Sequence, residues 1–284
     1  MRARRAAFDE DLSTPSTAGV VYPLCAMSDS MPVLVAPAAF GAGLSAPAVA
    51  AAIGRGLERA GLAPPDLCPL AGGGRGTIEV LLPVLGGETA DGFVLIEDGG
   101  TAIVEPADTA RATGARILAA VGAGVEVVLL AAAGAGASDG AGVVEAIEGG
   151  GGLRAAALVV LCEARAAAAA AVPGSIAGAL AARYGAPLVH GAAFVLEQLD
   201  FDARMRASRA LVIGEARLDA GTLAGRTAGE AAIRARQAGV PCHAVAAANG
   251  LDPFDVRILD LQAVLEAATI AALEDAGERL AAYL

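Results

Sequence analysis

Short apolar runs alternate with amphipathic stretches along most of the chain after residue 30. The runs that predict buried strands are 33–36, 93–97, 101–105, 125–131, 158–162, 210–214 and 243–247. Most of them are rich in valine, leucine and isoleucine, and the last is mainly alanine. Val49, Ile53 and Leu57 follow one another at intervals of four after Ser45, which predicts a helix that Ser45 caps. Strands that alternate with helices predict an α/β fold with parallel sheets.

One pair of runs predicts an exception to the parallel pattern. The tripeptide Asp98-Gly99-Gly100 separates the runs 93–97 and 101–105, and so short a turn predicts a hairpin and a mixed sheet. A helix is expected to begin near Thr113, with Ile117 and Val121 on its buried face. Another is expected from about residue 229 to 237, ending at Gly239.

Residues 1–30 show no apolar periodicity, which predicts a disordered N-terminal extension, with Met27 and Met31 as alternative starts. Acidic residues at 9–11 stand where a signal peptide would place its apolar run. Charged residues also interrupt the long apolar stretches, which excludes a typical membrane-spanning helix of about 20 residues. We therefore expect a cytoplasmic protein with no membrane contact.

The charge and the residue types of the chain exclude several classes of ligand and chemistry. Its formal net charge is −11, and no basic run follows the first five residues, so nucleic acid is an unsuitable partner. All 20 basic side chains are arginine, which excludes a Schiff-base lysine and a Walker-type phosphate lysine. The four cysteines and two histidines are scattered, so buried thiols are expected rather than a zinc site or disulfides. A small-molecule or protein partner fits this composition best.

Glycine-rich loops are the first candidates for a binding site. The segments 71–77 and 133–142 are two such loops, and a third stretch follows the run 210–214. Ligands in α/β folds bind beyond the carboxyl ends of strands, where glycine lets backbone amides approach a phosphate. The candidate nucleotide contacts in the first two loops are Gly72, Gly73, Gly74, Arg75, Gly76, Thr77, Gly134, Gly136, Ser138, Asp139 and Gly140. Structural turns are the alternative in a chain with 37 glycines.

Polar residues gather in the segment "IGEARLDAGTLAGR", residues 213–226, which is expected to be a loop directly after a strand. Glu215 and Asp219 could bind magnesium or accept a hydroxyl proton. Arg217 or Arg226 could hold a phosphoryl group, and Thr222 could donate a hydrogen bond to one. The alternative is an arginine–carboxylate network that only holds the loop in place.

From Val33 onward the chain resembles the glycerate kinase family of the two-domain bacterial type. The segment "VLVAPAAFGAGLSA" (33–46) is similar to the family's opening V-L-V-A-P-D-S-F-K-G-S-L-S-A, and "PLAGGGRGT" (69–77) to P-x-A-D-G-G-E-G-T. The segments 112–124 and 134–147 resemble G-T-G-E-L-I and the family's G-G-S-A-T-N-D-G-G-A-G loop. The most specific match is "VIGEARLDAGTLAGR" (212–226) with I-T-G-E-G-R-L-D-x-Q-T-L-x-G-K.

The resemblance implies an ATP-dependent kinase that uses Mg²⁺ to phosphorylate a hydroxyl of glycerate or a related small hydroxy acid. It implies a doubly wound parallel-sheet domain, 31–70 plus 186–284, and a shortened inserted α/β domain with a mixed sheet, 71–185. Glu215, Arg217 and Asp219 would be catalytic, and Asp139 and Glu215 would bind the metal. Thr222 and Arg226 would join the glycine-rich loops in holding ATP, and a homodimer stays an open alternative.

The departures from the family pattern remove side chains and keep the glycines. Ala38, Ala39 and Gly41 stand where the family has Asp, Ser and Lys. Gly72 replaces an Asp, Arg75 a Glu and Ala115 a Glu, so Arg75 could restore a positive charge near the phosphates. Two hypotheses follow: a working kinase with a rebuilt site, or a catalytically inactive paralogue that binds a nucleotide or a protein.

Overall fold

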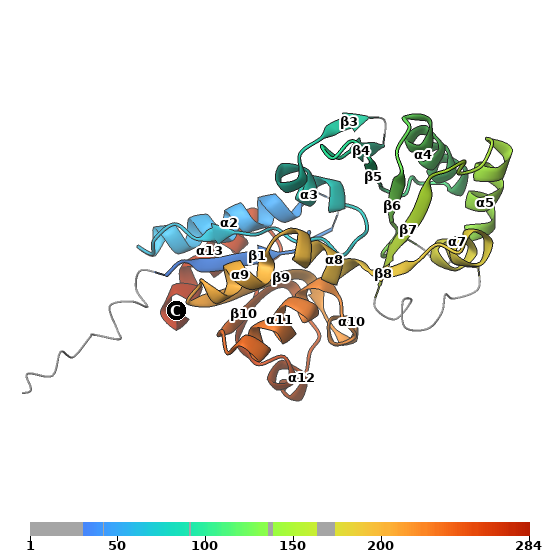
Figure 1. The fold of residues 1–284 in the computed structure, drawn as a ribbon. Helices are drawn as coiled ribbons and strands as arrows, with labels where there is room; N and C mark the ends of the chain where they lie inside the picture. The colour runs from blue at the N-terminus through green and yellow to red at the C-terminus, as the bar shows by residue number, and fades with distance from the viewer. Residues whose placement is uncertain (1–30, 42, 91, 136–138, 164–173) are drawn as a thin grey trace, which may run out of the picture.

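The computed structural model describes residues 31–41, 43–90, 92–135, 139–163 and 174–284, so the predicted extension 1–30 lies outside it. The first of two sheets has five parallel strands in the order β11-β10-β9-β1-β2 (Figure 1). These strands are β1 (Val33–Pro37), β2 (Asp66–Leu67), β9 (Ala210–Leu218), β10 (Cys242–Asn249) and β11 (Leu261–Glu266).

Helices cover both faces of this parallel sheet, because alternate residues of its strands point to opposite sides. Val33 and Val35 of β1 pack against α2 (Ala46–Arg59) and α13 (Ile270–Leu280). Leu34 and Ala36 belong to the core on the other face. That face is covered by α8 (Gly191–Gln198), α9 (Phe201–Arg206) and α11 (Thr227–Ala238). The predicted doubly wound arrangement is confirmed.

The second sheet has six strands in the order β3-β4-β5-β6-β7-β8 and is mixed, as the hairpin predicts. Its first three strands, β3 (Glu88–Ala90), β4 (Phe93–Leu95) and β5 (Thr101–Val104), are antiparallel. The others, β6 (Val127–Ala131), β7 (Ala157–Cys162) and β8 (Leu188–His190), continue from β5 in parallel. Three helices pack together against this sheet: α4 (Ala110–Gly122), α5 (Gly140–Gly149) and α7 (Ile176–Tyr184).

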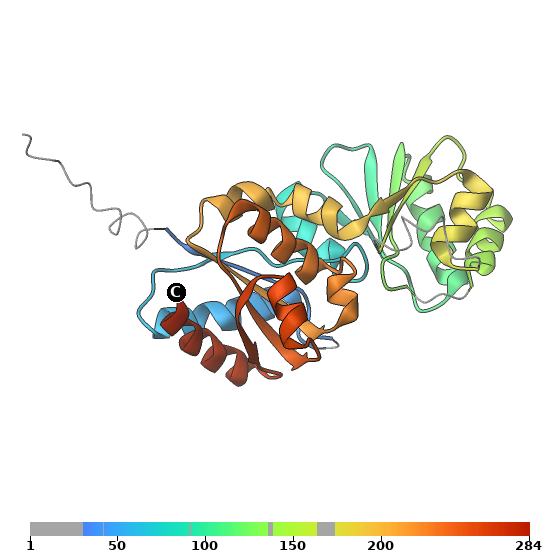
Figure 2. The same cartoon turned by 90° about the horizontal axis from the view of Figure 1, so that it is seen from below.

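The two sheets form two lobes that meet through α3 (Thr77–Leu85), α8 and the segments before them (Figure 2). At this junction the backbone at Gly191 approaches Gly72 and Gly73 so closely that a Cβ atom at Gly191 would lie 2.4 Å from the Gly72 oxygen. Gly74 forms an isolated β-bridge with Ala133 at the end of β6. The domain bounds at 70/71 and 185/186 stay a prediction; β8, just after the second, belongs to the mixed sheet.

Three local expectations need correction or refinement. Strand β9 continues to Leu218, because its register with β10 extends to Leu218 opposite Asn249, so Glu215 and Arg217 lie in a strand rather than in a loop. Helix α4 begins at Ala110, where the Thr109 side chain caps it, and not near Thr113. Ser45 occupies the N-cap position of α2, but its side chain makes no capping hydrogen bond.

The remaining elements complete the first lobe: α10 (Ala220–Leu223), α12 (Pro253–Ile258) and a 3-10 turn at Ala281–Tyr283. Cys68, Cys162 and Cys242 are buried free thiols, as expected, and Cys25 lies outside the described residues. Within the described ranges, no helix combines the length and the apolar character that crossing a membrane requires.

Candidate active site

A cavity of about 810 Å³ lies where the two lobes meet, and residues from both of them line it. Its size falls in the range of about 300 to 1,000 Å³ that small-molecule sites occupy. The lining residues are Gly72, Gly74, Arg75, Pro106, Ala107, Asp108, Thr109, Ala110, Thr113, Ala133, Gly134, Ala135, Asp139, Glu163, Ile176, His190, Ala192, Gly225, Arg226 and Thr227. The carboxyl-terminal ends of β6, β7 and β8 contribute to this wall, as expected for a ligand site in an α/β fold.

Only some of the residues that the sequence predicts for the site line this cavity. Of the predicted contacts, Gly72, Gly74, Arg75, Gly134, Asp139 and Arg226 line it. Gly73, Gly76 and Gly140 adjoin lining residues in the chain, and Thr77 lies two residues from Arg75, but none of the four is part of the wall. Gly136 and Ser138 lie outside the described residues.

Close packing gives the glycines of the first loop a structural cause. A Cβ atom at Gly74 would lie 2.0 Å from the Ala133 oxygen, and one at Gly73 would lie 2.5 Å from the Gly191 Cα. The Thr77 hydroxyl donates to the Gly74 oxygen at 2.6 Å and thereby closes the turn before α3. The glycines therefore allow the lobes to meet, and the same close approach brings backbone to the wall of the cavity.

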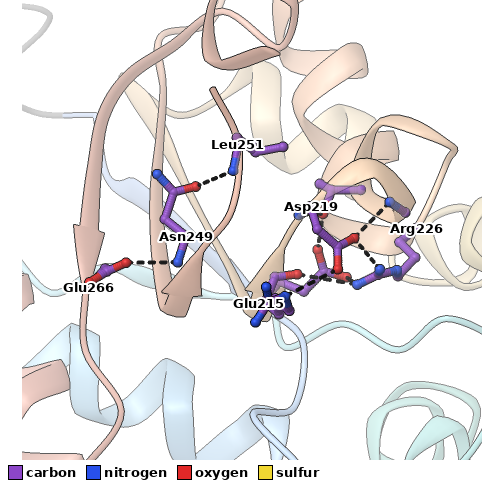
Figure 3. A network of polar contacts seen from close by, with 9 residues as sticks. Glu215, Asp219, Arg226, Asn249, Leu251 and Glu266 are labelled. Atoms are coloured by element: carbon purple, nitrogen blue, oxygen red, sulfur yellow. Dashed lines mark hydrogen bonds and ion pairs between the residues drawn. The ribbon is translucent and has the colours of Figure 1, made fainter. Parts of the chain in front are cut away.

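The polar residues of segment 213–226 form one network around Arg226 (Figure 3). The Arg226 guanidinium bonds to the Asp219 carboxylate, lies 3.4 Å from Oε1 of Glu215 and donates to the Arg217 oxygen at 3.2 Å. Arg217 itself is largely exposed, and its Nε lies 3.6 Å from Oδ2 of Asp219. Arg226 alone in this network lines the cavity, so the carboxylates reach the cavity through it.

Thr222 and the carboxylates hold one another in place. Asp219 caps α10, accepting from the Gly221 amide at 2.7 Å, while the Thr222 hydroxyl accepts from the Asp219 amide in a capping box. The same hydroxyl donates to Glu215 at 2.6 Å. Burial raises the pKa of Glu215, and the bonds from Thr222 and Arg226 oppose that rise. The arginine–carboxylate network anticipated as an alternative is thus present, with one arginine at the cavity.

A second set of contacts joins the carboxyl ends of β10 and β11 beside this network. The Asn249 amide donates to Glu266 at 2.9 Å, and the Asn249 side chain accepts from the Leu251 amide at 3.1 Å (Figure 3). Both bonds order the turn that follows β10. No motif in the sequence distinguishes Asn249 and Glu266 from ordinary turn residues.

The cavity wall is rich in charged groups. Arg75 forms an ion pair with Asp108, and the Arg75 guanidinium holds the pKa of Asp108 below its usual range. Asp139 accepts from the Gly142 amide at 3.1 Å, and Glu163 follows β7. Among the described residues, no three His, Cys, Asp or Glu side chains form a metal cluster. Magnesium does not require one, because it keeps waters and phosphate oxygens as ligands beside one or two carboxylates.

The sequence analysis did not single out His190 as a site residue. It is the last residue of β8 and lines the cavity, and its Nε2 lies 3.1 Å from the Gly225 oxygen. The signal that could have identified it is its position, because it ends an apolar run and precedes a glycine.

Comparisons with known proteins agree with this architecture. The sequence profile of the glycerate kinase family matches residues 33–108 and 152–284, which leaves α4, β6 and α5 outside the match. The crystal structure of the "putative glycerate kinase 2" from Salmonella typhimurium LT2 has a TM-score of 0.63, with 20% identity over 89% of this chain and 98% of that chain. Among curated proteins, none matches the sequence. Since the family profile covers more than half of the sequence, the chain belongs to the glycerate kinase family.

Proposed function

We propose that the protein is an ATP-dependent kinase that transfers the γ-phosphoryl group to a hydroxyl of glycerate or a related small hydroxy acid. Family membership supports the reaction class. The observation that carries the proposal is Arg226, which lines the cavity and is oriented by the carboxylates of Glu215 and Asp219. A guanidinium fixed in this way suits phosphoryl transfer, where positioning and neutralisation of negative charge supply most of the catalysis.

Glu215 and Asp219 act on the reaction through Arg226 in this proposal. Both carboxylates bond to its guanidinium, and neither lines the cavity. They are therefore positioning residues, and Arg226 is the group that contacts the phosphates. Arg217 is less suited to that contact, because it too lies outside the cavity wall and its guanidinium faces Asp219.

The carboxylates in the cavity wall suit a nucleotide that binds together with a magnesium ion. Asp108, Asp139 and Glu163 are negative, and ATP alone would be repelled by them. Asp139 and Glu163 would hold the ion, which supplies neutralisation of phosphate charge when bound. Glu215 is less suited to the metal, because Thr222 and Arg226 already occupy its oxygens.

Arg75 is the group proposed to receive the carboxylate of the hydroxy acid. It lines the cavity and is paired there with Asp108, whose side chain is exposed. A substrate carboxylate can replace Asp108 as its partner, because an exposed ion pair is weak in water. Arginine also offers two parallel donors to a carboxylate, which fixes the orientation of a small acid.

A coupled ADP-release assay with ATP, Mg²⁺ and D-glycerate tests the proposal. The wild type should release ADP only when an acceptor acid is present. Asp219→Asn should lose most of this turnover, whereas Asp202→Asn should retain it, because Asp202 pairs with Arg234 away from the cavity. A wild type that shows a thermal shift with ATP but no acceptor-dependent ADP release would contradict the kinase assignment and indicate an inactive paralogue.

A further inference from the structure

We propose that His190 is the catalytic base, which takes the proton of the acceptor hydroxyl at Nδ1. This inference rests on the proposed function and adds a residue to it. His190 ends β8 in the mixed sheet, whereas Gly225 belongs to the segment that follows α10 in the other lobe. His190 lines the cavity, and Nε2 of its imidazole lies 3.1 Å from the Gly225 oxygen.

The Gly225 contact decides which nitrogen of His190 carries the proton. A carbonyl oxygen can only accept a hydrogen bond, so Nε2 must be the donor. In the neutral ring the other nitrogen, Nδ1, then bears a lone pair and can accept a proton. The backbone of the 213–226 segment therefore sets His190 in the tautomer that a base requires.

Among the described residues no side chain or backbone group forms a hydrogen bond with Nδ1, and close packing holds the residue in place. His190 occupies the N-cap position of α8, yet its side chain makes no capping hydrogen bond. Its neighbour Gly191 is pressed against Gly72 and Gly73, where no Cβ atom would fit. The backbone that carries the imidazole is thus fixed at the junction of the lobes, which favours a defined position for Nδ1.

The other candidate bases in the described part of the cavity wall are carboxylates. Asp108 is paired with Arg75, which lowers its pKa and makes it a weaker base. Asp139 caps α5 through its bond to the Gly142 amide. In the proposed site Glu163, like Asp139, holds the metal ion, which leaves its carboxylate less suited to accept a proton. An imidazole is intrinsically a stronger base than a carboxylate near neutral pH.

The proposed step is balanced at His190. The O–H bond of the acceptor breaks and its proton moves to Nδ1, while the acceptor oxygen forms a bond to the γ-phosphorus. The bond from that phosphorus to the bridging oxygen of ADP breaks, and ADP leaves with the electron pair. The imidazolium then returns its proton to water. Arg226, in the same wall, stays positive throughout.

Two variants separate this base from a structural role of the same side chain. In His190→Gln the amide NH₂ can still donate to the Gly225 oxygen, but the side chain has no basic nitrogen. In His190→Ala both functions are absent. We expect kcat to fall about 10²- to 10⁴-fold in both variants, with the KM for ATP changed less than about threefold, because general-base catalysis supplies that factor.

Each result has a distinct meaning. A Gln variant within about fivefold of the wild-type kcat, beside an impaired Ala variant, would overturn the base role and leave a structural one. A wild type without acceptor-dependent ADP release would refute the proposed function as well, so the two failures are distinguishable. Long-range ¹H–¹⁵N spectra give a readout independent of activity, because the chain has two histidines and His190→Gln assigns them. The expected His190 tautomer is Nε2–H, and a ring protonated at Nδ1 alone would overturn the inference.

Discussion

Arg226 and Asp219 form an ion pair that joins the carboxyl-terminal end of β9 to the wall of the cavity. The pair is made within one short segment, because α10 reverses the chain between the two residues. Asp219 also caps α10 by accepting from the Gly221 amide. The same carboxylate therefore holds the turn of the chain and orients the Arg226 guanidinium. In the proposed kinase, the polar segment 213–226 therefore serves to orient Arg226 at the cavity.

The first prediction concerns this pair. Asp219→Asn keeps a good capping residue but removes the charge. We expect kcat to fall about tenfold to hundredfold, because Arg226 loses one of the two carboxylates that orient it. Arg226→Met removes the contact itself and should cost about 10²- to 10³-fold. If Asp219 acts through Arg226, the double variant should be no slower than Arg226→Met alone. Multiplicative losses in a double-mutant cycle would contradict that coupling.

The second prediction concerns the buried Glu215. Burial raises the pKa of Glu215 in the folded protein, so the native state binds this proton more tightly than the unfolded chain does. At a pH between the ordinary and the raised pKa of Glu215, the native state binds more protons than the unfolded chain. The free energy of unfolding therefore decreases as the pH rises through this window. Above the raised pKa, Glu215 no longer makes the free energy of unfolding depend on pH.

Urea unfolding from about pH 4 to pH 8 checks this sign against Glu215→Gln. The wild type should lose free energy of unfolding relative to the glutamine variant as the pH rises through that window. The variant has no carboxyl group at this site, so its curve lacks this component. Parallel curves for the two proteins would show that Glu215 is not perturbed by burial.

The third prediction concerns Arg75, which is 66% exposed and paired with an Asp108 that is 91% exposed. Arg75→Gln should leave the melting temperature unchanged and raise the KM for the hydroxy acid about tenfold, since an arginine–carboxylate contact is lost. Asp108→Asn frees the guanidinium and should leave that KM equal or lower. Steady-state kinetics with thermal melting measure both effects. A lower melting temperature with an unchanged KM would assign Arg75 to structure.

The fourth prediction concerns the packing of α2 on α13. A Cβ atom at Gly56 would lie 2.0 Å from the Glu274 backbone oxygen, so Gly56→Ala must push the helices apart. We expect a loss of about 1 to 3 kcal/mol in the free energy of unfolding. Gly122→Ala is the matched control, because among the described residues no atom outside its own helix and chain neighbours lies within 4 Å of a Cβ there. Alanine also favours helix over glycine by about 0.5 to 1 kcal/mol. Equal effects in urea unfolding would refute the close contact.

The alternation of apolar runs was sufficient to predict the elements of both sheets that have strong local patterns. The hairpin around Asp98 is confirmed, since its carboxylate accepts from the Gly100 and Thr101 amides at 2.8 and 2.9 Å. The end of β9 was mispredicted for a non-local reason. Glu215 and Arg217 look like loop residues in sequence, but pairing with β10 keeps them in the strand.

The candidate site could be predicted in its motifs but not in its contacts. Segment 213–226 was identified from its residues, yet sequence order could not show that Arg226 alone of its charged groups reaches the cavity. His190 was missed because its partner, the Gly225 oxygen, is a backbone atom 35 residues away. The sequence allowed two explanations for the glycines of the first loop, phosphate binding or a structural turn. The close packing against Gly191 and Ala133 shows that they have a structural role.

The most direct test of the kinase assignment is phosphorus NMR of a reaction that contains the protein, ATP, Mg²⁺ and D-glycerate. Transfer to the hydroxy acid predicts a new phosphomonoester signal that grows in step with ADP and is strongly diminished with Arg226→Met. ADP that appears with inorganic phosphate alone would show transfer to water instead. Spectra in which ATP persists unchanged, with other small hydroxy acids as well as with glycerate, would contradict the account.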